Sequence, residues 1–297
     1  MTAPAMSAGR ALRDIPIEQY GADQFDTPQP TLNSSTANRL LTRSPLHAWW
    51  SHPRLGGMFE EANNDMNIGS AAHALLLEGR DIIVSCPFDD WRTKAAKEMR
   101  DDVLSEGRIP LLTADAFRVQ QMVINARRLL DSSPDLAGLG PLDSELTYVW
   151  RDERVSVDGV ERETWMRCRP DAVTTDRAIV LSYKTTRSSA EPDAYMRTLL
   201  NAGYEMQAAF ELAGIEAVDG VRPAHYVWLV QEADEPYACS LIGLSPEMRT
   251  LGLARMDAAV ARWAECMAAG QWPGYPERIA YPLLPPWKLA EIEELIG

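Results

Sequence analysis

Two neighbouring stretches decide the fold: Arg169-Pro170-Asp171-Ala172 and, after a short polar turn, Ile179-Val180-Leu181-Ser182-Tyr183-Lys184-Thr185-Thr186. The second stretch is apolar and β-branched, which is typical of a buried strand. Residues two apart in a strand share a face, so Val180, Ser182 and Lys184 project together. A lysine that ends an apolar strand must find a partner for its charge, and Asp171 is the acid placed to meet it.

The surrounding pattern predicts an α/β protein. Stretches that alternate in polarity predict strands at 145–150, 164–169, 178–184, 225–231 and 238–242, with Gly159 in the hairpin between the first two. Apolar residues at helical spacing predict helices at 68–79, 113–130, 192–213 and 245–267. The sequence therefore predicts a central sheet flanked by helices.

Four further residues are candidates for chemistry. His73 lies off the apolar stripe of its predicted helix, Glu145 begins a predicted strand, and Tyr204 and Gln207 form an i, i+3 pair on a helix. Each residue also has an ordinary interpretation, as a core histidine, a strand-edge charge or a surface pair. Their order along the chain is the stronger signal.

In this order the residues resemble the RecE-type exonucleases (exonuclease VIII) of the PD-(D/E)XK nuclease superfamily, relatives of phage lambda exonuclease and RecB-type nucleases. Asp171 matches the first acid and Lys184 the final lysine of the motif. His73, Glu145 and the Tyr204/Gln207 pair match the family's helical histidine, strand acid and YxxQ helix. The resemblance covers roughly residues 31 to 290.

The resemblance implies a restriction-endonuclease-like core with a central mixed sheet flanked by helices. It also implies a Mg²⁺- or Mn²⁺-dependent exonuclease that digests double-stranded DNA from 5′ to 3′ and generates single strands for recombination. By resemblance, Asp171, His73 and the backbone carbonyl of Tyr183 bind the metal, and Lys184 orients or activates the attacking water. Tyr204 and Gln207 would position the DNA or the lysine.

Ser182 stands where the family carries its second acid. A serine hydroxyl is a weak ligand for a hard cation that favours carboxylates. Three explanations remain open: the chain is inactivated, another carboxylate replaces the acid, or the alignment is different. Glu145 is the better substitute, because Glu205 follows Tyr204 directly and is expected to point away from the Tyr204/Gln207 face. The alternative function is a catalytically silent protein that binds DNA ends.

The net charge of −14 requires that any DNA contact be local, because affinity for nucleic acid comes largely from neutralised phosphates. The candidate DNA contacts are Arg167, Arg169, Thr185 and Thr186. The resemblance further implies a ring-shaped homo-oligomer around double-stranded DNA ends and a single-strand annealing protein as partner. The chain shows no P-loop, nucleophile elbow or Gly-rich dinucleotide motif.

Composition bounds the domain organisation and the location. Residues 1 to about 30 are rich in Pro, Gly, Ala and Asp and predict a flexible arm or a tail that contacts another subunit. By resemblance, 31–290 form one nuclease domain that ends in a helix and a Pro-rich tail, which we expect to pack over the surface. The four cysteines have neither zinc-ligand nor disulfide spacing. No apolar run reaches the roughly 18 residues of a membrane helix, so we expect a cytoplasmic protein of a bacterial or phage-infected cell.

Overall fold

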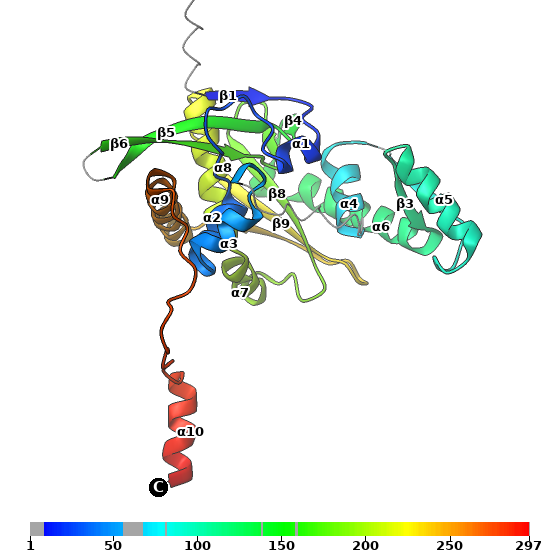
Figure 1. Ribbon diagram of the computed structural model, residues 1–297. Helices are drawn as coiled ribbons and strands as arrows, with labels where there is room; N and C mark the ends of the chain where they lie inside the picture. Colours follow the sequence, from blue (N-terminus) through cyan, green and yellow to red (C-terminus); the bar gives the residue numbers. More distant parts are fainter. Residues whose placement is uncertain (1–8, 56–67, 81, 138, 158–159, 297) are drawn as a thin grey trace, which may run out of the picture.

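The computed structural model describes residues 9–55, 68–80, 82–137, 139–157 and 160–296 and contains a central mixed sheet between two layers of helices (Figure 1). The strands of this sheet run in the order β10-β9-β8-β7-β4. They are β4 (Leu142–Ser144), β7 (Ala172–Thr174), β8 (Ile179–Thr186), β9 (His225–Glu232) and β10 (Cys239–Gly243). Strands β8 and β9 pair in parallel, and the other neighbours pair antiparallel. The predicted mixed sheet flanked by helices is confirmed.

Two smaller sheets accompany the central one. The first contains β1 (Gly9–Leu12), β5 (Thr147–Val157) and β6 (Val160–Cys168), and the second contains β2 (Ile83–Cys86) and β3 (Ile109–Leu112). Strands β5 and β6 pair antiparallel, as predicted for a hairpin, although Gly159 lies outside the described residues.

The helices of the described chain share their burial between the two faces of the central sheet. They are α1 (Ile17–Gly21), α2 (Ser34–Thr42), α3 (Pro45–Ser51), α4 (Ile68–Leu77), α5 (Lys94–Ser105), α6 (Thr113–Ser132), α7 (Pro192–Ala202), α8 (Tyr204–Asp219), α9 (Pro246–Ala269) and α10 (Pro286–Ile296), with short 3-10 turns at Pro53–Leu55 and Pro134–Leu136. Helices α2, α8 and α9 contribute to the core on one face, and α4 and α6 to the core on the other.

Strand alternation decides which side chains of β8 meet which helices. Val180 packs in the core with α8, whereas Leu181 and Tyr183 pack in the core with α4 and α6. Lys184 lies against Tyr204 at the start of α8, on the same side as Val180. The predicted shared face of Val180, Ser182 and Lys184 therefore agrees with the structure.

The single helix predicted over 192–213 is in fact two helices. Gly203 separates α7 from α8 and adopts φ 73°, in the left-handed region that favours glycine. A Cβ atom on Gly203 would lie 3.0 Å from the Asn38 side chain, so the turn also brings α8 close to α2. This break makes Tyr204 the first residue of α8 and directs the helix towards β8.

The prediction of a flexible arm is wrong for residues 9–30. Strand β1 pairs with β5, and Phe25 is buried against Val149 and Trp165. Asp23 is buried with its carboxylate beside the guanidinium of Arg167, at 3.1 Å, and accepts a hydrogen bond from the Thr31 backbone N–H. Sequence reasoning missed this ion pair because it joins residues 144 positions apart. Residues 1–8 lie outside the described residues.

The Pro-rich tail does not pack over the surface along its whole length. Pro273 accepts a hydrogen bond from the Leu46 backbone N–H, and the Tyr275 ring contacts His47. Beyond these contacts Leu283 is 95% exposed, and α10 stands apart from the body of the protein (Figure 1). Within the described ranges no helix has the length and apolar character needed to span a membrane.

Candidate active site

Asp171 forms the centre of the candidate site, in the turn between β6 and β7. Its Oδ2 atom accepts hydrogen bonds from Ser182 Oγ and the Tyr183 backbone N–H, both at 2.8 Å, and lies 3.6 Å from Lys184 Nζ. Burial by itself raises the pKa of this carboxyl, but Lys184, His73 and Ser182 outweigh burial and hold the pKa well below its usual range. Asp171 is therefore ionised at neutral pH, and the expected meeting of Asp171 with Lys184 is confirmed.

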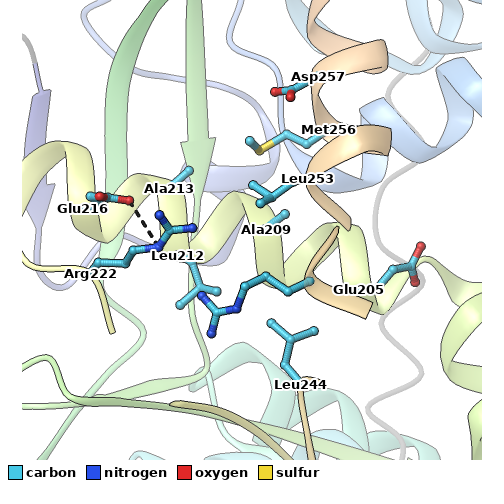
Figure 2. Close-up of a pocket in the computed structure, with 11 residues that line it drawn as sticks. Glu205, Ala209, Leu212, Ala213, Glu216, Arg222, Leu244, Leu253, Met256 and Asp257 are labelled. Atoms are coloured by element: carbon cyan, nitrogen blue, oxygen red, sulfur yellow. Dashed lines mark ion pairs between the residues drawn. The ribbon is translucent and has the colours of Figure 1, made fainter. Parts of the chain in front are cut away.

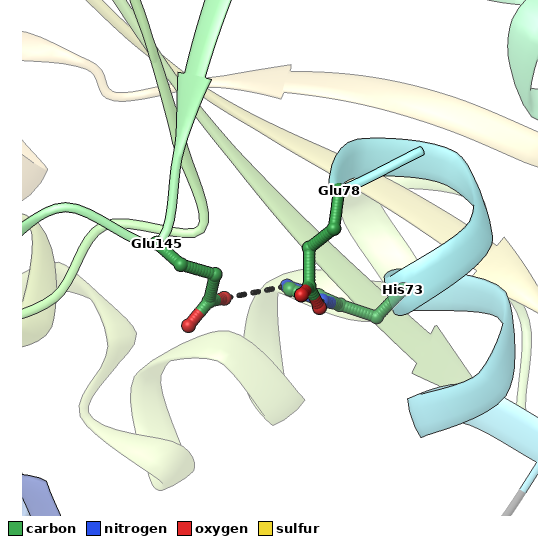
Figure 3. A group of neighbouring side chains, drawn as sticks. All are labelled: His73, Glu78 and Glu145. Atoms are coloured by element: carbon green, nitrogen blue, oxygen red, sulfur yellow. Dashed lines mark ion pairs between the residues drawn. The ribbon is translucent and has the colours of Figure 1, made fainter. Parts of the chain in front are cut away.

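His73 projects from α4 towards the carboxylates of Glu78 and Glu145 (Figure 3), and the carboxylate of Asp171 also lies beside it. Its Nε2 atom lies 3.5 Å from Asp171 Oδ1 and 3.6 Å from Glu145 Oε1, and its Nδ1 atom lies 3.6 Å from Glu78 Oε1. Burial lowers the pKa of His73, but the hydrogen bonds with Asp171 and Glu78 raise it to about 10. Without a bound metal, His73 is therefore an imidazolium that neutralises part of the charge of these acids, and it would have to release that proton to bind a metal.

Glu145 lies between β4 and β5 in a strained backbone conformation. Its φ of 56° is in the left-handed region, which side chains other than glycine rarely adopt. Its N–H donates to the Asp171 carbonyl at 3.1 Å, and its carboxylate forms an ion pair with Arg169. Burial raises the pKa of Glu145, although Arg169 and His73 oppose the rise. Strained backbone conformations persist where surrounding contacts fix them, often at functional sites. Here the hydrogen bond to the Asp171 carbonyl fixes the conformation and places Glu145 beside Asp171.

Glu78 is a residue that sequence reasoning did not assign to the site. It follows α4 directly, and Gly79 after it adopts φ 62°, as expected of a residue that ends a helix. His73 pulls the pKa of Glu78 down through a hydrogen bond. Nothing in the sequence indicated that Glu78 would lie beside His73, because residues i and i+5 of a regular helix lie on different faces. Only the turn after Leu77 brings Glu78 back to His73.

Lys184 lies between an acid and an aromatic ring. Its Nζ atom is 3.6 Å from Asp171 Oδ2 and 4.9 Å from the centre of the Tyr204 ring. Burial lowers the pKa of Lys184, but the charges of Asp171 and then Glu211 outweigh burial and raise it. The face of an aromatic ring attracts an ammonium group. Lys184 is therefore held as a cation beside Asp171.

A buried hydrogen-bond network lies on the α8 side of β8. Gln207 Nε2 donates to Glu211 Oε1 at 2.7 Å, and the Tyr226 hydroxyl donates to Glu211 Oε2 at 2.8 Å. The Tyr226 hydroxyl also neighbours the side chain of Ser182. Burial, followed by the charge of Asp171, raises the pKa of Glu211 to about 8. Gln207 thus contacts Glu211, a carboxyl that sequence reasoning did not single out.

Glu205 does not approach the site, as its helical position predicted. Its buried carboxylate pairs with Arg255 of α9. It lines an apolar hollow of about 240 Å³ between α8 and α9, together with Leu212 and Met256 (Figure 2). This hollow includes none of the residues that surround Asp171.

The donor set fits a hard divalent cation. One imidazole and the carboxylates of Glu78 and Glu145 offer ligand atoms that all lie within 4.8 Å of one another, and Asp171 adjoins them through His73. Carboxylate oxygens, with an imidazole, suit Mg²⁺ and Mn²⁺. Ser182 is fully buried and donates its hydroxyl to Asp171, so its side chain supports Asp171 and adds no charge.

The candidate DNA contacts separate into two groups. Arg167 is 2% exposed and pairs with Asp23, so the expectation that it contacts DNA is wrong: its guanidinium is enclosed by protein. Arg169 is also largely buried, on the ion pair with Glu145. Thr185 and Thr186 end β8 and are partly exposed, and Thr186 Oγ1 accepts a hydrogen bond from the Ser188 N–H at 3.0 Å.

A polar hollow of about 340 Å³ adjoins the site between α2 and the start of α8. Its lining includes Arg39, Arg43, Asn38, Tyr204 and Gln207. In the described part of the chain no carboxylate lies within 4.0 Å of the guanidinium of Arg39 or Arg43. The hollow therefore brings Arg39 and Arg43, which have no acidic partner among the described residues, close to Tyr204 and Gln207. These two residues contact Lys184 and Glu211, respectively.

Comparisons with known proteins identify a similar fold among solved structures but no family. No protein-family model and no curated protein matches the sequence. Among solved structures, SSO0001 aligns over 69% of this chain and 87% of its own with 15% identity, but its TM-score of 0.27 supports no argument.

The crystal structure of a "Putative exonuclease" from Eubacterium rectale aligns over 94% of this chain and 98% of its own, with a TM-score of 0.55 and 9% identity. At this identity the likeness concerns the fold. The chain is thus similar over nearly its whole length to that protein in its mixed α/β arrangement of sheets and helices.

Proposed function

We propose that this chain is a metal-dependent nuclease of the PD-(D/E)XK type, related in function to the RecE-type exonucleases. The observation that carries the proposal is Lys184 at the end of β8, 3.6 Å from an ionised Asp171 that also lies 3.5 Å from His73. The fold shared with the Eubacterium rectale protein, whose name is that of an exonuclease, supports the same function. Fold alone does not fix function, so the proposal depends on the site.

The site has the groups that phosphodiester hydrolysis needs. In the reaction, a water oxygen bonds to phosphorus, the bond from phosphorus to one sugar oxygen breaks, and that oxygen gains a proton as the water loses one. His73, Glu145 and Asp171 would hold a Mg²⁺ or Mn²⁺ ion, which when bound activates water and neutralises phosphate charge. Lys184 donates hydrogen bonds to the attacking water or to a phosphate oxygen, and Tyr204 keeps the ammonium in place.

We propose double-stranded DNA ends as the substrate, digested from 5′ to 3′. The hollow beside Tyr204 and Gln207 supports a nucleic-acid substrate, because Arg39 and Arg43 there are free to neutralise phosphates. The polarity and the role in recombination rest on the resemblance alone.

A second function is favoured by one specific observation. Ser182 brings no carboxylate to β8, and a protein that had lost metal-dependent cleavage could still bind DNA ends through the same hollow. This alternative predicts DNA binding without cleavage in Mg²⁺ or Mn²⁺.

The two functions are separated by a cleavage assay on linear duplex DNA labelled at either the 5′ or the 3′ end, beside a closed circular duplex. The nuclease predicts degradation of linear DNA with Mg²⁺ or Mn²⁺ and the disappearance of this degradation in Asp171→Asn. The end-binding alternative predicts binding by all proteins and cleavage by none. Cleavage that persists in Asp171→Asn would reject the proposed site.

We further propose a ring-shaped homo-oligomer and a single-strand annealing protein as partner, both acting inside the cell. The exposed apolar side chains of α10, which include Leu289, Ile292 and Leu295, support an interface with another chain. Light scattering on the full chain and on Leu295→Asp tests the oligomer: a mass independent of concentration and equal to one chain would reject it.

A further inference from the structure

Glu211 is a buried carboxyl that the fold does not need. It is 1% exposed in the middle of α8, and its two oxygens are held by neutral donors, Gln207 and Tyr226. Within the described residues no lysine, arginine or histidine nitrogen lies within 4.0 Å of it. Burying an acid without a cation is costly, and an apolar residue at this position would avoid that cost.

The position of Glu211 on α8 directs it to the candidate site. Residues i, i+3 and i+7 of a helix lie on one face, so Tyr204, Gln207 and Glu211 form one line. Tyr204 at the start of this line contacts Lys184, and Glu211 at its end contacts Tyr226 of β9. The line thus runs along the side of β8 that carries Ser182.

The Tyr226 side chain links Glu211 to the position of the missing acid. The Tyr226 hydroxyl donates to Glu211 and neighbours the Ser182 side chain, and Ser182 Oγ donates to Asp171 at 2.8 Å. One tyrosine hydroxyl therefore separates the Glu211 carboxyl from the side chain at position 182.

Electrostatics explain why the serine and the glutamate occur together. A second carboxylate at position 182 would face both Asp171 and Glu211 in a buried setting, and like charges there disfavour one another. With serine at 182, Glu211 is the carboxyl that, once ionised, acts on Lys184 alongside Asp171. Having serine at 182 together with glutamate at 211 leaves two acids beside Lys184, Asp171 and Glu211.

We propose that Glu211, carried by α8, supplies to the metal site the second carboxylate that β8 lacks at Ser182. The inference rests on the proposed function and names a residue that neither the motif nor the comparisons assign. It predicts that the second carboxylate can be supplied from either position: Glu211→Gln removes the carboxylate from α8, and Ser182→Asp in the same chain supplies one from β8.

The test measures Mn²⁺ affinity by calorimetry, together with cleavage of linear duplex DNA, in the full chain and four variants. These are Glu211→Gln, the double variant Glu211→Gln/Ser182→Asp, the control Glu205→Gln and Asp171→Asn. Glu205 is a matched control because it is a buried glutamate of the same helix that pairs with Arg255 away from the site. Glutamine preserves the shape of glutamate, and circular dichroism verifies that each variant is folded.

We expect Glu211→Gln to weaken Mn²⁺ binding at least about tenfold, Glu205→Gln to leave it unchanged, and the double variant to recover most of the affinity. A Glu211→Gln protein with unchanged Mn²⁺ affinity and cleavage would overturn the inference, as would a double variant no better than the single one. The proposed function fails separately: a full chain that binds no Mn²⁺ and behaves like Asp171→Asn rejects the metal site itself, and with it this role of Glu211.

Discussion

The burial of Glu211 makes a prediction about stability that needs no metal and no DNA. Its pKa rises from 4.5 to about 8, first because of burial and then because of the charge of Asp171. Between these two values the folded protein keeps a proton on Glu211 that the unfolded chain releases. The free energy of unfolding therefore falls as pH rises through this window, by about 1.4 kcal/mol per pH unit.

Glu211→Gln removes this titration. Without divalent metal, we expect the variant to gain stability relative to the unmodified chain as pH rises from 5 to 8. A difference of about 3.5 between the two pKa values corresponds to roughly 5 kcal/mol as an upper limit. Below pH 4.5 both chains carry a neutral side chain at this position, so the difference contributed by this titration vanishes there.

Urea unfolding in EDTA, followed by circular dichroism at pH 5, 6, 7 and 8, measures the difference directly. Glu205→Gln is again the control, because Glu205 is a buried glutamate of the same helix and pairs with Arg255 away from Glu211. A Glu211→Gln stability that runs parallel to that of the unmodified chain across these pH values would refute the reasoning, since it would mean that Glu211 is already ionised in the fold.

Three further predictions concern other charged residues. Lys184→Met should reduce DNA cleavage by about 10²-fold or more while Mn²⁺ binding, measured by calorimetry, survives; an equal reduction of both would show that Lys184 serves the metal site instead. The double variant Arg39→Gln/Arg43→Gln should bind DNA with a weaker salt dependence, measured by fluorescence anisotropy. The negative slope of log binding constant against log salt concentration should become shallower by about 0.7 to 0.9 for each phosphate that the variant no longer neutralises. Arg249→Gln, which removes one positive charge beside the hollow of Figure 2, should leave that slope unchanged. Arg167→Met should lower the free energy of unfolding by up to about 3–5 kcal/mol, because it removes the nearest cation from the buried carboxylate of Asp23 and leaves Arg54 at 3.6 Å; a denaturant midpoint equal to that of the unmodified chain would contradict the structural role.

What could be predicted from the sequence is what local patterns determine. The apolar strand that ends at Lys184 and the helix that carries His73 follow from periodicity, and both form as expected. Residues two apart on β8 share a face whatever the tertiary structure, so the side on which Ser182 and Lys184 lie could be inferred directly. The meeting of Asp171 with Lys184 follows from the same strand and the turn before it.

The rest depended on interactions between distant segments. Arg167 looked like a phosphate-binding residue because the sequence does not reveal its partner, Asp23, which folds back from the supposed arm. Glu78 reaches His73 only through the turn that ends α4. In the sequence Glu211 is one acid in an apolar helix, and its role depends on Tyr226, which β9 places against it. In each case the partner's chemistry, and not the residue's own, decides its role.

The position of Arg39 and Arg43 bears on how an acidic chain could bind DNA, as the proposed function requires. With a net charge of −14, the surface as a whole repels a polyanion. Some arginines of the described chain pair with acids, among them Arg13, Arg177 and Arg255. Arg39 and Arg43 instead face the hollow beside Tyr204 without a carboxylate partner among the described residues. Under the proposed function this hollow is where DNA would be bound, and because few phosphates would be neutralised there, the affinity for DNA should depend on salt less steeply than that of a protein coated in basic residues.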